Sequence, residues 1–371
     1  MNDIQSHLDR RWPFSIVGFV AVALIASCAS PSDYDPGRWS PSPPVFYPGY
    51  DGGISQRDGS SDAKGCLHAV NGACTCDGGT CERQDKFVVF GGRNDDDGYL
   101  DSTWEWDGNT WFQRNTAGPS ARMSTAATLG NKVVLFGGTS DSALGETWEW
   151  DGHSWGRRLA ATEPPKRMHG AMATLDVNVV LFGGENGNAT LHDTWEWNGT
   201  TWTERNVAGA PLARSGHAMA TLGNKVVLFG GRGERVFDDT WEWNGTCWTQ
   251  LNVTGPKPRD GHAMATFGNK VILFGGYGVN ATGSTTRLDD TWEWDGTTWT
   301  QRSPAVAPKA RELHGMGTLE GKVLLFAGSD VGESSLTYFN DLWEWDGTTW
   351  SKRNVGTAPS ARHGSAAAIL P

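Results

Sequence analysis

From residue 87 onward, the hydrophobic and polar positions of the chain repeat. Each copy contains a continuous apolar run that ends in two glycines, then a Trp-Glu-Trp triplet, and then a third Trp seven residues after the first. In the clearest copy, the apolar run KVILF at 270–274 precedes Gly275, and Trp292 and Trp299 follow. Six copies, spaced by 44 to 52 residues, contain 18 of the 20 tryptophans. A period of this length is typical of repeat architectures in which every copy is one supersecondary unit.

The pattern within each copy predicts four short β-strands. HAMATF at 262–267 alternates small and apolar residues, and KVILF is continuously apolar, as expected of a strand buried on both faces. Trp292 and Trp294 lie two positions apart, so their rings point to the same face of a third strand. The DGTT sequence at 295–298 predicts a hairpin turn into a fourth strand that begins at Trp299.

The copies resemble Kelch repeats. They share with that family the apolar run before Gly-Gly, an aromatic and acidic strand, a further Trp after a tight turn, and an Arg near the start of each copy. The resemblance covers residues 87–371 and implies an all-β, six-bladed Kelch-type β-propeller with four antiparallel strands in each blade. The chain departs from the family pattern at Ala327, which replaces the first Gly of the pair, and in having Trp where many Kelch repeats carry another aromatic residue.

The count of strands predicts how the ring closes. The repeat region begins within a copy, with FVVFGG at Phe87, and it ends after a lone first strand at Ala361–Leu370. We expect this C-terminal strand to join the three N-terminal strands, because closure would remove two open sheet edges. We also expect the repeated tryptophans to form the core and the contacts between blades, rather than a surface that stacks sugars, because each indole buries a large apolar area.

The residues before the repeats indicate export. Two arginines precede an apolar run at 14–26, which is short for a membrane span and typical of a signal peptide. Ile-Ala-Ser before Cys28 resembles a bacterial lipoprotein cleavage box, which implies a signal peptide at 1–27 and a lipid on Cys28. An ordinary signal peptide is the alternative. Residues 28–65 are rich in Pro, Ser and Gly and predict a disordered tether.

Clustered cysteines occupy the next segment, residues 66–86. In an exported protein, four cysteines this close together predict two disulfide bonds, and the sequence leaves three possible pairings open. A zinc site is the alternative, although the CxC spacing suits zinc poorly. Cys247 is left over from this set and is interpreted as a bystander in a predicted turn. The four clustered cysteines are Cys66, Cys74, Cys76 and Cys81.

The charge of the chain narrows the choice of partners. The formal net charge is −11, the pI is near 5.3, and there is no block of Lys and Arg. An acidic chain of this kind argues against nucleic acid or an anionic membrane surface as a partner. We therefore expect contact with a membrane only through the lipid anchor, at a bacterial cell envelope.

Two charged positions recur in every copy and predict structural roles, because a catalytic group is needed only once. The middle residue of the triplet is always Glu, and an Arg always precedes the first strand. We expect these groups to form ion pairs or hydrogen bonds between neighbouring blades. The glutamates are Glu105, Glu149, Glu196, Glu242, Glu293 and Glu344, and the arginines are Arg122, Arg167, Arg214, Arg259, Arg311 and Arg362.

Histidines and an acidic run are the candidates for metal binding. His217, His262 and His314 recur three residues after the Arg, where a repeated packing role is favoured over a metal site. Two further histidines are displaced from that register. The run 93–101 resembles part of a calcium loop, but an Arg would occupy the first ligand position, so a solvated acidic loop is favoured. We expect no bound metal and no cofactor.

The sequence contains none of three common catalytic motifs, GxSxG, the P-loop and HExxH. Copper oxidases of the galactose oxidase kind also use a Kelch-like propeller, but that resemblance demands a paired Tyr and Cys that have no counterpart here. We therefore assign no catalytic residue.

Variation between copies is concentrated in one set of loops. Between the Gly pair and the triplet, the six inserts contain 11, 9, 10, 9, 15 and 14 residues, whereas the two tight turns hardly vary. In a four-stranded blade these inserts emerge on the same face as the connections between blades, so we expect recognition there. The candidate ligand-binding residues are Tyr99, His192, Phe237, Tyr277, Arg287, Tyr338 and Phe339.

The favoured function is a lipid-anchored binding module at the cell envelope that recognises a protein or a glycan through these loops. The alternative is a periplasmic sugar-modifying enzyme, because some bacterial six-bladed Kelch proteins interconvert sialic acid anomers. An enzyme would concentrate unlike titratable groups in one place, whereas this chain repeats the same groups in every copy. A purely structural surface protein is the third hypothesis.

Overall fold

The computed structural model describes residues 75–76, 79–80, 84–280, 282–331 and 336–371, and it describes side chains from residue 84 onward. All of these residues belong to one compact unit, Ser55–Pro371. The predicted signal peptide, the lipid site at Cys28, the tether and the pairing of the four clustered cysteines lie outside the described residues and side chains. No helix of the described part is long and apolar enough to span a membrane.

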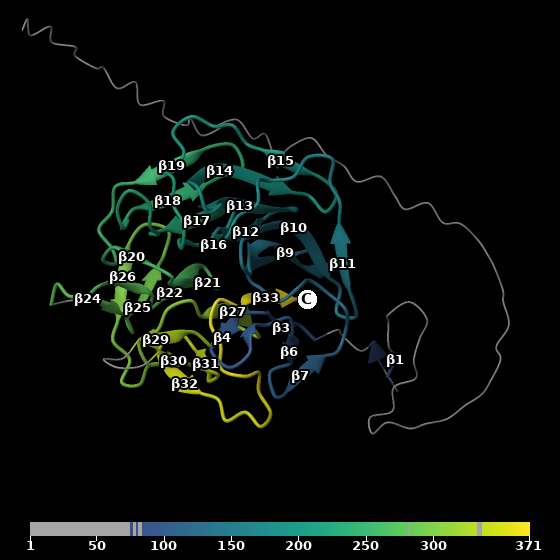
Figure 1. The fold of residues 1–371 in the computed structure, drawn as a ribbon. Coiled ribbons are helices and arrows are strands. Elements are labelled where there is room, and N and C mark those ends of the chain that lie inside the picture. Colours follow the sequence, from purple (N-terminus) through teal and green to yellow (C-terminus); the bar gives the residue numbers. More distant parts are fainter. Residues whose placement is uncertain (1–74, 77–78, 81–83, 281, 332–335) are drawn as a thin grey trace, which may run out of the picture. The chain divides into compact units, whose positions relative to one another are not determined.

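Six antiparallel sheets of four strands make up most of the described residues, and we number them I to VI (Figure 1). Sheet I has the order β33 (Ala366–Leu370), β3 (Lys86–Phe90), β6 (Thr103–Trp106) and β7 (Trp111–Arg114). Sheet II contains β8 (Met123–Leu129), β9 (Lys132–Thr139), β10 (Ala143–Trp150) and β11 (Trp155–Arg158). Sheet III contains β12 (Ala171–Leu175), β13 (Asn178–Glu185), β14 (Thr190–Trp197) and β15 (Trp202–Glu204).

The remaining large sheets follow the same order of strands. Sheet IV contains β16 (Ala218–Leu222), β17 (Lys225–Phe229), β18 (Thr240–Trp243) and β19 (Trp248–Leu251). Sheet V contains β21 (Ala263–Phe267), β22 (Lys270–Phe274), β25 (Thr291–Trp294) and β26 (Trp299–Arg302). Sheet VI contains β27 (Gly315–Leu319), β28 (Lys322–Phe326), β31 (Leu342–Trp345) and β32 (Trp350–Lys352).

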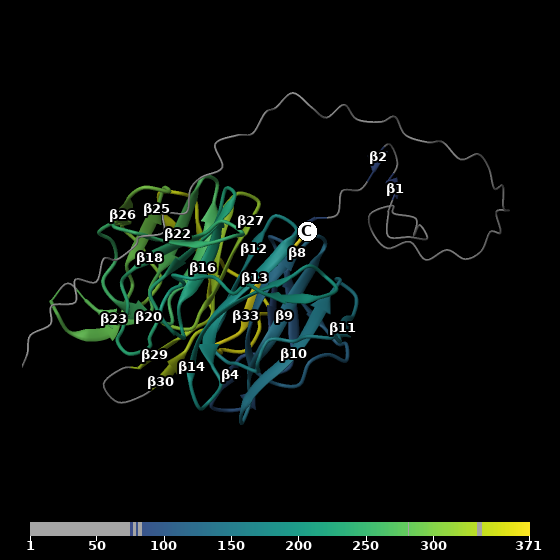
Figure 2. The ribbon, with the colours of Figure 1, turned by 90° about the horizontal axis from the view of Figure 1, so that it is seen from above.

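Short strands form the inserts that the sequence marks as variable. Figure 2 places most of them toward one end of the large sheets. They are β4 (Arg93–Asn94) with β5 (Gly98–Tyr99), β20 (Arg259–Asp260) with β23 (Tyr277–Val279) and β24 (Thr285–Arg287), and β29 (Ser329–Val331) with β30 (Leu336–Tyr338). A separate hairpin, β1 (Thr75–Cys76) with β2 (Gly79–Thr80), precedes the repeats.

Sheet I brings together the two ends of the repeat region. Strand β33 pairs with β3 in antiparallel register, from Lys86 opposite Leu370 to Phe90 opposite Ala366. The first strands of the six sheets are neighbours in the order β8, β12, β16, β21, β27 and β33, and β33 in turn contacts β8. The predicted pairing of the last strand with the first three is therefore present in the hydrogen-bond pattern.

Phenylalanine and tryptophan interlock successive sheets. In each sheet the second strand contains a buried apolar run that ends in a Phe, and this Phe packs on the third Trp of the next sheet. The ring centroids lie 4.9 to 5.5 Å apart, within the range of favourable aromatic pairs. The pairs are Phe90 and Trp155, Phe136 and Trp202, Phe182 and Trp248, Phe229 and Trp299, Phe274 and Trp350, and Phe326 and Trp111.

The third Trp also makes a buried hydrogen bond to the preceding sheet. Its indole Nε1 donates to the hydroxyl of the Thr that directly precedes the Trp-Glu-Trp triplet there, at 2.8 to 2.9 Å, in five of the six described sheets. Sheet VI has Leu342 at that position, and Trp111 Nε1 is consequently buried without a partner among the described residues. The five threonines are Thr103, Thr147, Thr194, Thr240 and Thr291.

Threonines of the first strands form a second set of bonds between sheets. Each hydroxyl donates to a backbone carbonyl on the preceding first strand, as Thr266 does to Thr221 at 2.6 Å and Thr128 does to Ile369 at 2.5 Å. Thr174, Thr221 and Thr318 make the same contact with Thr128, Thr174 and Thr266. Ile369 occupies this position in sheet I and has no hydroxyl to donate.

The paired glycines connect successive sheets through their backbone. The second Gly donates its N–H to the carbonyl of the Arg that precedes the next first strand, at 2.8 to 2.9 Å in all six described copies. A Cβ on Gly91 would lie 2.4 Å from that carbonyl oxygen, so a side chain there would need a local shift of the neighbouring backbone. Ala327 adopts the same left-handed backbone, with φ of +67° against +66° at Gly91. The departure from the repeat pattern therefore leaves the local geometry unchanged.

Three of the six triplet glutamates join neighbouring sheets through indoles, whereas the equivalent indoles of Trp106, Trp294 and Trp345 are buried without a partner in the described part of the chain. Glu105 accepts a hydrogen bond from Trp150 of sheet II at 2.9 Å, and it also binds Lys86 and Arg114 of its own sheet. Burial raises the pKa of Glu105, but the bonds from Lys86, Trp150 and Arg114 outweigh it and lower the pKa overall. Equivalent bonds from the next sheet reach Glu149 from Trp197 and Glu196 from Trp243.

The prediction for the repeated arginines is wrong in its choice of partner. Arg214 lies fully buried and forms a forked pair with Asp239 of its own sheet, at 2.6 and 2.9 Å. Its partner is the acidic residue two positions before the first Trp, because the guanidinium lies beneath the insert and not between sheets. Forked pairs of the same kind join Arg167 to Asp193, Arg259 to Asp290 and Arg311 to Asp341, and Arg122 makes a single bond to Glu146.

Cys247 lies half-buried in the tight turn between β18 and β19. It takes part in a disulfide bond. The interpretation of this residue as an unpaired bystander is therefore wrong, because its sulfur is covalently engaged. The partner lies outside the described side chains.

We predict that the indole–threonine bonds are individually worth a measurable part of the stability. Thr291→Val keeps the side-chain shape but leaves the buried Nε1 of Trp350 without an acceptor, so the free energy of unfolding should fall by about 1–3 kcal/mol. Urea denaturation measures the change. Thr300→Val, at an exposed position of β26, is the control and should stay within about 0.5 kcal/mol of the wild type. Equal effects of the two substitutions would contradict the prediction.

Candidate functional site

The variable end of the sheets has a rim built from paired backbone segments. In every described sheet, the residue after the repeated Arg pairs with a residue of the insert that follows the second strand. The inserts and the connections between sheets therefore lie together, as the strand order predicts. The pairs are Met123 with Thr139, Met168 with Glu185, Ser215 with Arg232, Asp260 with Tyr277, Glu312 with Ser329, and His363 with Arg93.

The next residue of each copy, two after the Arg, surrounds the opening of a central cavity, and we call these six the mouth positions. Five of the six donate their backbone N–H to the carbonyl of a neighbouring mouth position, at 2.7 to 3.2 Å, so their backbones are joined in sequence. Five of them have a left-handed backbone with φ between +55° and +65°. The mouth positions are Ser124, His169, Gly216, Gly261, Leu313 and Gly364.

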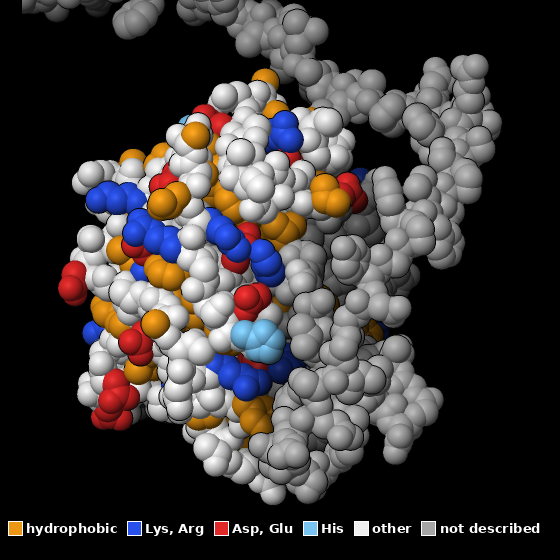
Figure 3. Space-filling model, turned by 90° about the vertical axis from the view of Figure 1, so that its right-hand side faces the viewer, with side chains coloured by type: hydrophobic (Ala, Val, Ile, Leu, Met, Phe, Trp, Pro, Cys, Tyr) orange, Lys and Arg blue, Asp and Glu red, His pale blue; other side chains and the backbone are white. Residues whose placement is uncertain are grey.

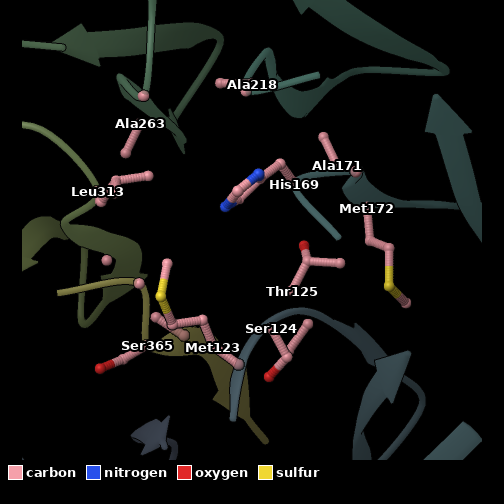
Figure 4. A pocket seen from close by; sticks show the side chains of 18 of the residues that line it. Met123, Ser124, Thr125, His169, Ala171, Met172, Ala218, Ala263, Leu313 and Ser365 are labelled. Atoms are coloured by element: carbon pink, nitrogen blue, oxygen red, sulfur yellow. The ribbon is translucent and has the colours of Figure 1, made fainter. Parts of the chain in front are cut away.

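The cavity inside the mouth has a volume of about 180 Å³ and is lined by residues of all six sheets. Small residues of the first strands, such as Ala171, Ala218 and Ala263, form part of its wall (Figure 4). A second cavity of about 220 Å³ is lined by the deeper part of the same strands, including the bonded threonines. The two cavities share Met172, Met219, Met264 and Met316, whose flexible side chains adapt to irregular spaces.

His169 projects into the opening of this cavity (Figure 4). Its Nδ1 lies 2.9 Å from Oε1 of Glu185, and both side chains are about one-third exposed. The bond from His169 outweighs partial burial and lowers the pKa of Glu185, so this carboxylate is ionised at neutral pH and can only accept. Nδ1 of His169 is therefore the donor, and Nε2 is left available to the cavity.

Three histidines deeper in the wall stay uncharged. His217, His262 and His314 are 5 to 6% exposed and pack edge-on against Phe182, Phe229 and Phe274 of the preceding sheets. Burial, followed by a nearby Arg, lowers the pKa of His217 and His314 to about 3, and that of His262 well below its usual value. Within the described residues, no group of three or more His, Cys, Asp or Glu side chains could hold a metal ion.

Two of the predicted recognition residues form one cluster on the rim. Tyr277 and Arg287 face each other on β23 and β24, with the guanidinium 4.7 Å from the ring centroid. Arg287 also pairs with Glu312 at 2.5 Å. Arg232 also lies over the ring of Tyr277, 5.8 Å from its centroid, and pairs with Asp260. The cluster couples the inserts of sheets IV and V to the mouth of sheet VI.

Tyr338 belongs to a second rim cluster. Its hydroxyl donates to Asp95 at 2.9 Å, and its ring meets His363 edge-on at 5.0 Å. Burial, together with the bond to Asp95, raises the pKa of Tyr338, so the phenol stays protonated. Arg93 lies over the ring of Tyr99, 5.6 Å from its centroid. Residues that are distant in the sequence therefore share one patch.

The other predicted recognition residues have different surroundings. Phe237 is fully buried beneath Arg214, whose guanidinium lies 4.1 Å from the ring centroid, so its assignment to ligand binding is wrong. Phe339 packs in the same way on Arg311 but is only half-buried. His192 is exposed on β14. The two phenylalanines cover the buried Arg–Asp pairs, which is a structural role.

The acidic run at 93–101 folds as the β4–β5 hairpin. Asn94 is buried, and its side chain donates to Asp97 at 3.1 Å while accepting from the Asp97 N–H at 2.7 Å. These two residues bind each other across the turn. Figure 3 shows that acidic, basic and histidine side chains are interspersed on one face of the molecule, without a block of one sign.

A family model, the KLHDC2/KLHL20/DRC7 Kelch-repeats domain, matches residues 79–276 and 242–371. The chain belongs to this Kelch-repeat family. The match includes every large sheet, and it agrees with the resemblance seen in the Gly pairs and Trp triplets. A comparison with curated proteins finds no match to the chain.

Sequence reasoning missed the mouth of this Kelch domain. The signal was present as a shift of register, because the copy at 167–170 reads Arg-Met-His-Gly where the next copy reads Arg-Ser-Gly-His. A His in place of Gly at the second position implies a side chain on a left-handed backbone. Its direction toward a cavity becomes visible only when the six sheets are placed together.

We predict that the Kelch domain loses stability as the pH falls below about 6.5, because His217, His262 and His314 stay neutral when folded but bind protons when unfolded. Each buried His should contribute a slope of about 1.4 kcal/mol per pH unit between its unfolded and folded pKa values. His262→Gln should make the pH dependence shallower by about that amount in urea denaturation at pH 7 and pH 5. The exposed control, His192→Gln, should leave the slope unchanged, and a parallel slope for His262→Gln would refute the assignment.

Proposed function

We propose that the six sheets are the blades of one closed propeller and that the chain is a protein-interaction module acting through its rim. Closure is supported by the pairing of β33 with β3 and by six Phe–Trp contacts, one for each pair of successive sheets. A closed ring has no free sheet edge to which a partner could add a strand, so specific contacts with a partner are made by the loops. The Kelch-repeat family membership supports an interaction role.

The main support for this proposal is that the residues between the sheets repeat from copy to copy, whereas the residues of the rim differ. The interfaces repeat the same Phe, Trp, Thr and Glu in successive sheets, whereas the rim has unlike residues in each sheet. Tyr277, Arg287 and Tyr338 combine aromatic area with hydrogen-bonding groups, which are residue types enriched at the centres of protein interfaces. A protein partner is therefore favoured over a glycan. We do not retain the sugar-modifying alternative.

We predict that the triple variant Tyr277→Ala, Arg287→Ala and Tyr338→Ala loses partner recovery by about tenfold or more, because two rim clusters are removed together. Cross-linking in the producing cells followed by quantitative mass spectrometry measures recovery. A variant of the exposed tight turn at the other end of sheet III, Val177→Ser, is the control. Equal recovery of partner proteins by the triple variant and the wild type would contradict the rim-binding proposal.

We further propose the arrangement of the N-terminal part: signal peptide 1–27, tether 28–65, and a disulfide-bonded segment 66–86 leading to the propeller at 87–371. A lipid on Cys28 would anchor the module at a bacterial cell envelope, and the tether would let the rim reach its partner. The support is the Ile-Ala-Ser-Cys sequence after an apolar run.

The expected outcome for the anchor is incorporation of labelled palmitate by the wild type and none by Cys28→Ser. The reason is that no other residue of the box has the thiol that accepts the lipid. Metabolic labelling followed by gel autoradiography provides the measurement. Undiminished label in Cys28→Ser would refute the lipid site, while leaving the rim proposal unaffected.

A further inference from the structure

Two of the mouth positions carry side chains on a backbone that favours glycine. His169 has φ of +55° and Leu313 has φ of +56°, whereas three other mouth positions in the same conformation are Gly216, Gly261 and Gly364. A left-handed backbone is unfavourable for an L residue with a Cβ. Strain of this kind persists where the surrounding structure holds the backbone in place, and it is frequent at binding and active sites.

Both side chains point into the opening of the cavity (Figure 4). Leu313 offers an apolar surface, and His169 offers Nε2 once Glu185 has bound Nδ1. The two residues come from sheets III and VI, which are separated by two sheets in either direction along the order of the first strands. A group that enters the cavity passes between them.

We propose that His169 and Leu313 determine the specificity of this cavity, and that it takes an uncharged side chain of a protein partner that donates a hydrogen bond to Nε2 of His169. This inference rests on the proposed interaction function and adds to it the chemistry of one contact.

The lining of the cavity excludes a charged occupant. Its residues include no Asp, Glu, Lys or Arg. The three buried histidines of its wall are neutral at physiological pH, because burial lowers their pKa. A charge placed among them would lose its hydration without gaining a counterion. The volume of about 180 Å³ suits a side chain rather than a folded element.

The hydrogen-bonding direction follows from Glu185. Because this carboxylate is an acceptor only, the proton in the neutral form of the imidazole lies on Nδ1, and in that form Nε2 presents a lone pair. A side chain with an N–H or O–H group satisfies that acceptor, and a purely apolar side chain leaves it without a partner. Met123 and Met168, also in the lining, supply adaptable apolar contact around the polar group.

The first test shows whether the side chains of His169 and Leu313 strain the fold or stabilise it. His169→Gly and Leu313→Gly relieve the left-handed backbone and should raise the melting temperature by roughly 2–4 °C each. The matched control is Gly216→Ala, which adds a Cβ at an equivalent position, 3.2 Å from the side chain of Asp260, and should lower the melting temperature. A fall in melting temperature in both glycine variants would mean that the side chains serve the fold, and it would overturn the inference.

The second test measures recognition with a defined probe. Peptides are selected by the full-length protein from a random displayed library, and their affinities are measured by fluorescence anisotropy. His169→Gly and Leu313→Gly should bind the selected peptides about tenfold or more weakly, and His169→Asn, which tolerates a left-handed backbone and keeps an acceptor, should recover part of the loss. Replacing the anchoring residue of the peptide with Asp or Lys should weaken binding similarly.

The possible outcomes test the role of the mouth separately from the proposed protein-interaction function. Peptides that bind both glycine variants as tightly as the wild type, or that anchor through a charged residue, would overturn the role of the mouth and leave rim binding intact. Failure of the library to yield any binder, together with unchanged partner recovery by the triple rim variant, would overturn the interaction function itself.

Discussion

The contact between the Phe that ends the apolar run of one second strand and the third Trp of the next sheet is the interaction on which the rest of the structure depends. A four-stranded sheet with two apolar faces cannot be stable alone, and each Trp buries one face of its own sheet while filling the gap beside its neighbour. The indole N–H must also find an acceptor, and the Thr hydroxyl of the neighbouring sheet supplies it at a fixed distance. Apolar packing and polar satisfaction therefore set the same spacing between sheets.

The joint between sheets VI and I departs from this scheme. Leu342 replaces the accepting Thr, Ile369 replaces the donating Thr of the first strand, and Ser102 replaces the acidic partner of the Arg. Trp104, Trp106 and Trp111 of sheet I all have indole nitrogens that are buried without a partner in the described part of the chain. The Phe326–Trp111 packing and the backbone bond from Gly328 to Arg362 remain. The side of sheet I that faces sheet VI is thus held mainly by packing, and the β33–β3 pairing within sheet I joins both ends of the repeats.

Repetition has a consequence for function. Residues that pack between successive sheets must suit every such interface, so they are nearly the same in successive copies. The rim and the mouth are free of that demand, because their side chains contact the inserts or the cavity. His169 and Leu313 show the difference most clearly, since both occupy a backbone conformation that three other sheets fill with glycine. Side chains therefore differ most between copies at positions that do not pack against a neighbouring sheet.

Local periodicity in the sequence was enough to determine the strands, their order within each sheet, the interface role of the tryptophans and the side on which the inserts gather, because a period of two and a Gly or Asp-Gly turn act over a few residues. It did not determine which carboxylate binds the repeated Arg, that Phe237 would be buried beneath Arg214, or that His169 would face a cavity. Those relations join residues of different elements, and only packing of the sheets brings them within contact distance. The tertiary structure therefore decided the site, since a cavity lined by six separate strands exists in no single stretch of the chain.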